Sequence, residues 1–110
     1  MRLEIKSLWS PDCDASTELP ADREDFEVLI SVSLGEEGEE ETELFYLTVC
    51  SPMRLARLTL GTFVSATLIL ERFDWAELRL RLEKLLRHAQ SCDDWNQIVA
   101  ALAPYLRYAD

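Results

Sequence analysis

Six of the eight residues between positions 36 and 43 are glutamates: Glu36, Glu37, Glu39, Glu40, Glu41 and Glu43. Carboxylates at this density attract basic partners, and they repel nucleic acid and anionic lipid. Residues 1–50 hold 14 Asp and Glu against 3 Lys and Arg, a net charge of −11, whereas residues 51–110 hold 7 against 8, a net charge of +1. This asymmetry favours a binding protein that recognises a basic partner.

The glutamate segment also has an interpretation that involves no partner. Like charges about 4 Å apart in water repel by only about 1 kcal/mol, and physiological salt screens them beyond roughly 8 Å. An acidic hairpin tip is therefore easily tolerated, and it keeps the edge of a sheet soluble. Recognition and solubility both remain open for this segment. For the recognition alternative we expect Trp9, Asp12 and Asp14 to join the glutamates, because an aromatic residue beside carboxylates suits an interface anchor.

Other kinds of chemistry find little support in the residues. The single histidine, His88, falls on the polar side of a predicted helix, and no serine or cysteine stands in a G-x-S-x-G context. Three glycines form neither the G-x-x-x-x-G-K nor the G-x-G-x-x-G phosphate loop. The acidic residues lack the spacing of a calcium-binding loop. We therefore expect no catalytic residue, no cofactor and no metal ion, and a small enzyme is only the third alternative.

Length and composition predict a single domain over residues 1–110. A chain of 110 residues with 48% hydrophobic residues can build one core without disulfides or metal. Its three cysteines, Cys13, Cys50 and Cys92, are odd in number and far apart, which indicates a reducing compartment. The first residues do not form a signal peptide, and the longest apolar tract is too short to span a bilayer. We expect a cytoplasmic protein that binds neither membrane nor nucleic acid.

Alternating side chains predict three strands in the first half of the chain. In residues 2–9, Leu3, Ile5 and Trp9 fall on one side, and residues 26–34 show the clearest period of two. Glycines within the glutamate segment and an aromatic, β-branched run at residues 44–50 then predict a hairpin with an acidic tip. Residues 10–24 lack periodicity and predict a loop.

The second half predicts three helices and one strand. Ser51 and Pro52 start a short helix over residues 51–62, and residues 63–72 predict an interior strand that is apolar on both faces.

Asp74 caps an amphipathic helix with ion pairs Glu77–Arg81 and Glu83–Arg87. Asp93 or Asp94 caps a last helix, which Pro104 kinks or ends, and we expect Tyr105, Leu106 and Tyr108 to fold back as a tail. The order β-β-β-α-β-α-α predicts an α+β fold, in which a four-stranded sheet carries the two C-terminal amphipathic helices on one face. The other face is then partly exposed or lightly covered by the short helix and the loop at residues 10–24.

Several segments resemble the immunity protein 8 family of bacterial polymorphic toxin systems, which belongs to the contact-dependent growth inhibition type. The resemblance lies in residues 3–12 (LEIKSLWSPD), 48–52 (TVCSP), 70–75 (LERFDW) and 94–102 (DWNQIVAAL), followed by a tyrosine-rich tail. It implies an α+β toxin inhibitor that binds and neutralises a cognate toxin domain inside the producing cell, and it transfers no catalytic site.

A toxin domain that cleaves nucleic acid must be basic to approach phosphates, so we expect a basic nuclease as the partner. The alternative of another class is a non-catalytic adaptor or assembly module whose acidic surface serves solubility. An exposed edge strand would also allow a homodimer, and the sequence leaves that open.

Overall fold

The computed structural model describes residues 1–11, 20–58 and 64–109. Its elements in chain order are β1 (Leu3–Trp9), β2 (Glu27–Glu36), β3 (Glu43–Cys50), α1 (Pro52–Leu58), β4 (Thr67–Ile69), α2 (Trp75–Arg87), α3 (Trp95–Leu102) and β5 (Arg107–Tyr108). The predicted α+β class is confirmed. The predicted order is also found, but a further strand follows the last helix, so the sheet has five strands instead of four.

The sheet runs in the order β1-β2-β3-β4, and β5 also pairs with β3. Neighbouring strands are antiparallel except for β3 and β4, which are parallel. The two short strands share one edge of β3: β4 lies along Thr48–Cys50, and β5 lies beside Phe45 and Tyr46. The tail that was expected only to fold back therefore completes the sheet.

The predicted interior strand over residues 63–72 is wrong in its length and position. Strand β4 has three residues and lies at the edge of the sheet, where Ile69 is half exposed. Leu68 packs against the core and Leu70 is buried beyond the end of the strand. Within its described residues 64–72, the apolar run thus supplies the core with Leu68 and Leu70 and does not form a strand buried on both faces.

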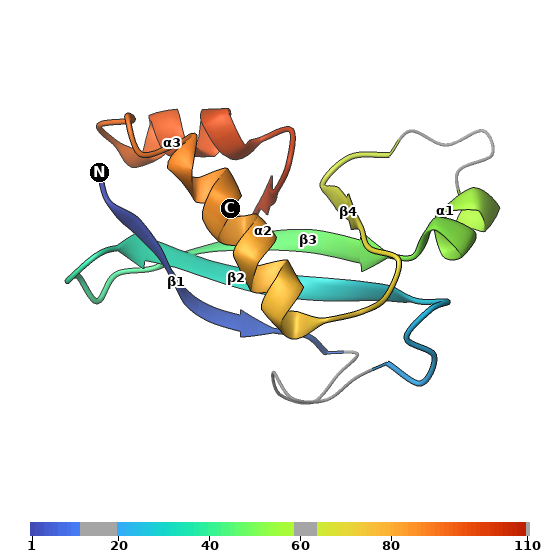
Figure 1. The fold of residues 1–110 in the computed structure, drawn as a ribbon. Coiled ribbons are helices and arrows are strands. Elements are labelled where there is room, and N and C mark those ends of the chain that lie inside the picture. Colours follow the sequence, from blue (N-terminus) through green and yellow to red (C-terminus); the bar gives the residue numbers. More distant parts are fainter. Residues whose placement is uncertain (12–19, 59–63, 110) are drawn as a thin grey trace.

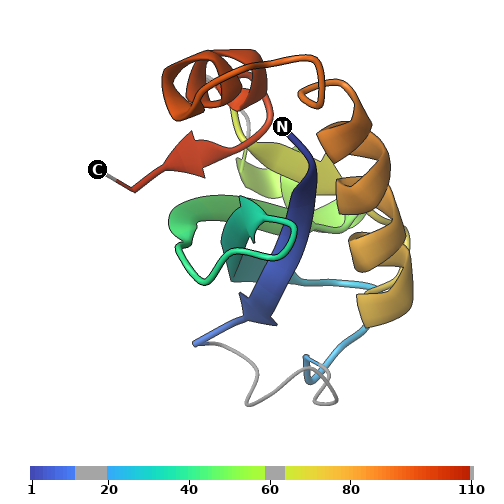
Figure 2. The same ribbon diagram turned by 90° about the vertical axis from the view of Figure 1, so that its left-hand side faces the viewer.

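Helices α2 and α3 cover the same face of the sheet, as predicted. In Figure 1, α2 crosses in front of the strands and α3 lies above them, and Figure 2 shows α2 from the side. Their buried side chains join those of the strands in one hydrophobic core. The core includes Leu3, Val28, Ile30, Val32, Leu34, Phe45, Leu47, Val49, Leu78, Leu82, Leu86, Ile98 and Leu102. We call the opposite face, over which no helix of the described residues packs, the open face.

A β-bulge at Lys6 decides which residues of β1 point to each face. Ile5 lies opposite Leu34, and Leu8 lies opposite Val32, so both pack on the core. The extra residue between them reverses the alternation, because two residues of a bulged strand face one residue of its neighbour. Trp9 therefore points to the open face and is 50% exposed. The prediction that Trp9 shares a side with Ile5 is wrong for this reason.

The predicted helix caps are confirmed. Asp74 Oδ1 accepts hydrogen bonds from the backbone N–H groups of Ala76 (2.8 Å) and Glu77 (3.3 Å), and Asp94 Oδ1 accepts from Gln97 N–H (2.9 Å). Helix α3 ends at Leu102, two residues before the proline, as expected from the steric clash that proline causes within a helix.

The charged face of α2 contains two i,i+4 ion pairs. Arg81 pairs with Glu77 at 3.3 Å, as predicted, whereas Glu83 pairs with Arg79 at 3.9 Å and not with the predicted Arg87. Within the described ranges, no helix is both long and apolar enough to cross a membrane.

Candidate functional site

The glutamate segment forms the tip of the β2–β3 hairpin, as predicted. Glu39 N–H donates to Glu36 O (3.0 Å), and Gly38 has φ +87°, a backbone conformation that favours glycine. Glu37 N–H donates to Arg2 O (2.8 Å), which ties the tip to the chain before β1. We define the acidic tip as the exposed glutamates Glu36, Glu37, Glu39, Glu40 and Glu41. These five carboxylates are accessible to a partner.

The ion pairing of the acidic tip is weak. Glu37 lies 3.8 Å from Arg2, and both side chains are more than half exposed. Exposed pairs of this kind contribute about 0–1 kcal/mol, because water and salt screen them. The negative potential of the acidic tip therefore extends into solvent.

Glu43 differs from the five glutamates of the acidic tip. It is half-buried, and its Oε2 accepts a hydrogen bond of 2.7 Å from the hydroxyl of Tyr108 on β5. The Tyr108 ring lies against Phe45, with the ring centroids 5.2 Å apart. Glu43 thus helps to hold β5 against β3, and this contact depends on a strand that the sequence did not predict.

The other candidate residues lie away from the acidic tip. Trp9 is paired with Ser31, whereas Leu3, at the start of the same strand, is paired with Glu36. Ser31 and Glu36 are five positions apart on β2, which at about 3.3 Å per residue places Trp9 roughly 16 Å from the base of the acidic tip. Asp12 and Asp14 lie outside the described residues. The structure therefore does not bring Trp9 and the glutamates into one cluster.

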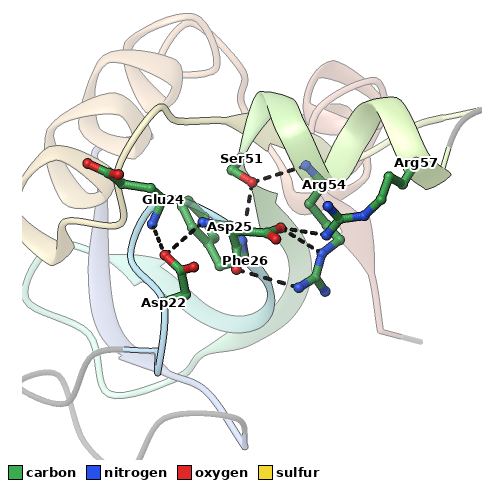
Figure 3. A network of polar contacts seen from close by, with 7 residues as sticks. All are labelled: Asp22, Glu24, Asp25, Phe26, Ser51, Arg54 and Arg57. Atoms are coloured by element: carbon green, nitrogen blue, oxygen red, sulfur yellow. Dashed lines mark hydrogen bonds and ion pairs between the residues drawn. The ribbon is translucent and has the colours of Figure 1, made fainter.

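A second acidic segment, residues 22–25, is bound within the fold. Figure 3 shows its contacts with α1. Asp22 Oδ1 accepts from the backbone N–H groups of Glu24 (2.9 Å) and Asp25 (3.2 Å), and Asp25 Oδ1 accepts from Arg54 Nε (3.1 Å) and Arg57 Nη2 (2.6 Å). The hydrogen bond from Arg57 is the main reason that the pKa of Asp25 lies below its ordinary value; desolvation opposes this shift, and Arg54 adds to it.

Ser51, at the start of α1, holds the same region from inside. Its Oγ is buried and accepts from the backbone N–H groups of Phe26 and Arg54, both at 3.2 Å, while Ser51 N–H donates to Phe26 O (3.0 Å). The predicted cap at Ser51 is confirmed. The polar groups of residues 22–26 and 51–57 therefore satisfy one another, and they position α1 at the end of the sheet.

The segment at residues 70–75 also serves the fold. Phe73 is fully buried, and its ring packs edge-on against Phe26 (5.5 Å between centroids) and Trp75 (5.2 Å). Arg23 donates through Nε (3.1 Å) and Nη2 (2.9 Å) to Phe73 O. The segment thus joins α2 to the chain before β2.

A groove on the helical side of the molecule is lined by basic and apolar residues. A groove of about 420 Å³ lies between α2, residues 64–68 and residues 104–106. Arg81, Lys84 and His88 are among its lining residues, beside the apolar side chains of Leu47, Leu68, Leu82 and Leu85. No carboxylate lines it in the described part of the chain. A basic partner is therefore favoured by the acidic tip and disfavoured by this groove.

Comparison with protein families gives one match. The chain matches the family described as Immunity protein 8 over residues 3–109, nearly the whole sequence. No curated protein matches the chain, and no solved structure matches it. The resemblance seen in the sequence is thereby confirmed, and the chain belongs to the Immunity protein 8 family.

Proposed function

We propose that this immunity protein binds a cognate toxin domain and neutralises it in the cytosol of the producing cell. Its family implies an immunity protein of a toxin system, and we propose that it inhibits the toxin without catalysis of its own. Residues of the first and last strands are packed into the same hydrophobic core, which supports a single domain over residues 1–110 as the inhibitory unit.

The observation that supports a basic partner is the acidic tip. Five exposed carboxylates with one weak ion pair produce a directional negative potential. A nuclease domain must carry a basic surface to approach phosphates, so an inhibitor that presents carboxylates to that surface gains association rate and selectivity. We propose that the toxin is a basic nuclease and that the acidic tip imitates the charge of the phosphate backbone.

Salt dependence of the complex tests this mechanism. The binding partner for this test is the cognate toxin domain, inactivated by substitution in its own active site. Between about 50 and 500 mM NaCl we expect the association rate to fall at least tenfold and the dissociation rate to change much less. An association rate that does not depend on salt would contradict electrostatic capture. Co-expression of the active toxin domain with and without this chain, scored by survival, tests neutralisation itself.

A further inference from the structure

Four strands place one residue each in a row across the open face. Trp9 on β1 lies opposite Ser31 on β2, Ser31 opposite Tyr46 on β3, and Tyr46 opposite Arg107 on β5. Residues directly opposite one another in antiparallel strands point to the same face. The four side chains, which we call the cross-sheet row, therefore lie together on the open face. Three of them are of the residue types that dominate binding energy at interfaces: tryptophan, tyrosine and arginine.

The cross-sheet row offers one aromatic ring to a cationic side chain. The Arg107 guanidinium lies 5.4 Å from the centroid of the Tyr46 ring, so this ring already has a cation beside it. Trp9 is 50% exposed and lies two strands from Tyr46, a backbone separation of about 10 Å. Because Arg107 repels a second cation near Tyr46, a basic side chain from a partner is directed to the face of Trp9.

The acidic tip folds back toward the same face. Gly35 lies opposite Glu4 on the open-face side of β2, where a Cβ atom would lie 2.7 Å from Glu41 O and 2.6 Å from Lys6 Cε. The chain at Glu41 therefore passes over the open face beside Gly35. Gly35 and Ser31 are four positions apart along β2, a distance of roughly 13 Å. The acidic tip and the cross-sheet row are the two ends of one surface.

We propose that the toxin domain docks on the open face, with an arginine or lysine side chain stacked on Trp9 and further basic residues facing the acidic tip. This inference rests on the proposed function and adds the surface and its anchor to it. The carboxylates of the acidic tip favour this face for a basic partner, whereas the groove on the helical side presents Lys84, and Arg81 that is paired with Glu77, and no carboxylate in the described part of the chain. A tryptophan ring is the aromatic group to which a cation binds most favourably.

Substitution of Trp9 tests the anchor. We expect Trp9→Ala to weaken binding of the inactivated toxin domain at least tenfold by calorimetry, and Trp9→Phe to restore part of the loss. Tyr105→Ala is the matched control, because Tyr105 is 52% exposed and borders the groove on the helical side. We expect this control to bind within about twofold of the unmodified protein, since a residue outside an interface contributes little. Thermal melting of each variant verifies that it is folded.

A second pair of variants adds a side chain to the cross-sheet row. Ser31 is only partly buried and points to the open face, so a longer residue there extends into solvent. Ser31→Lys places a cation beside Trp9, and we expect it to weaken binding more than Ser31→Gln, which is neutral and of similar length. If the unmodified protein binds the toxin domain, and both Trp9→Ala and Ser31→Lys bind it with the same affinity as the unmodified protein, the inference is wrong and the proposed function stands. If the unmodified protein fails to bind, both are wrong.

Discussion

The two acidic segments of the N-terminal half are both rich in carboxylates but differ in their contacts with the rest of the fold. The acidic tip presents five exposed carboxylates, with one weak ion pair to Arg2. In residues 22–25, Asp22 accepts from two backbone N–H groups, and Asp25 lies between two arginines of α1. A carboxylate that has partners within the fold stabilises the fold, whereas one that lacks them is available to another protein. Charge density in a sequence does not distinguish these two cases.

Charge reversal at the acidic tip should have the largest effect. For the combined variant Glu39→Lys, Glu40→Lys and Glu41→Lys we expect the association rate with the toxin domain to fall tenfold or more at low salt, because steering depends on local potential. The free energy of unfolding should change by less than about 0.5 kcal/mol. Stopped-flow association and urea denaturation measure the two quantities.

A variant with the same change of net charge elsewhere is the control for this prediction. Glu71, Glu83 and Asp93 are exposed and lie outside the hairpin. Reversing these three to lysine should reduce the association rate much less. Equal losses in both variants would mean that net charge alone, and not the position of the acidic tip, sets the rate.

Ser51→Ala, which acts on the contacts between residues 22–26 and α1, should have the largest effect on the free energy of unfolding. It removes a helix cap and leaves the buried N–H of Phe26 without its side-chain acceptor. We expect a loss of about 2 kcal/mol in the free energy of unfolding, measured in urea, and an unchanged association rate. Ser7→Ala, at an exposed serine, should change stability by less than about 0.5 kcal/mol. A loss that small at Ser51 would show that the contacts with α1 contribute little.

Tyr108→Phe tests whether Glu43 serves the fold or takes part in binding with the acidic tip. The variant removes the hydroxyl that donates to Glu43 and keeps the ring against Phe45. We expect a loss of about 1 kcal/mol in the free energy of unfolding, because one partly buried hydrogen bond is lost. The association rate should stay unchanged, since the charge of Glu43 remains. A clear change in that rate would place Glu43 among the contact residues.

The smallest effect concerns Asp25 and pH. Because the fold lowers the pKa of this carboxyl, its ionised form stabilises the protein above the ordinary pKa of about 3.9, and this contribution is lost as pH falls through the lower folded value. Asp25→Asn should therefore lower the melting temperature at pH 7, and the difference from the unmodified protein should shrink below about pH 4. Glu40→Gln in the acidic tip should show no such difference at either pH. If the melting temperature of Asp25→Asn lies below that of the unmodified protein by the same amount at every pH, the variant loses stability for a reason other than the missing charge.

Local features of the fold were predictable from the sequence, and long-range pairings were not. Strands β1 to β3 and the caps at Asp74 and Asp94 follow from periodicity and from contacts within a few residues. The bulge at Lys6 is defined by the pairing of β1 with β2 and leaves no pattern in the sequence of β1 alone. The orientation of Trp9 was predicted wrongly for this reason. Strand β5 has two residues, which is too short for any periodicity, and it forms because β3 offers an unpaired edge.

In the candidate site, too, local features were predictable and long-range contacts were not. Exposure of the acidic tip was predictable, because a turn with two glycines and six glutamates has no apolar side chain to bury. The internal partners of Glu43 and Asp25 were not, since they lie 65 residues away on β5 and 29 or 32 residues away on α1. The position of Tyr46 on the open face had a detectable signal, because Tyr46 alternates with the core residues of β3. The sequence gives no such signal for Arg107.

Strand β5 gives the cross-sheet row an order of assembly during translation. The hairpin of β2 and β3 is synthesised early, but the edge of β3 at Phe45 and Tyr46 stays unpaired until residues 107 and 108 have left the ribosome. Arg107 is also the last member of the cross-sheet row to be made. A nascent chain therefore carries the acidic tip before it carries the complete row, so the charged end of the proposed surface is made before its aromatic and cationic end is complete.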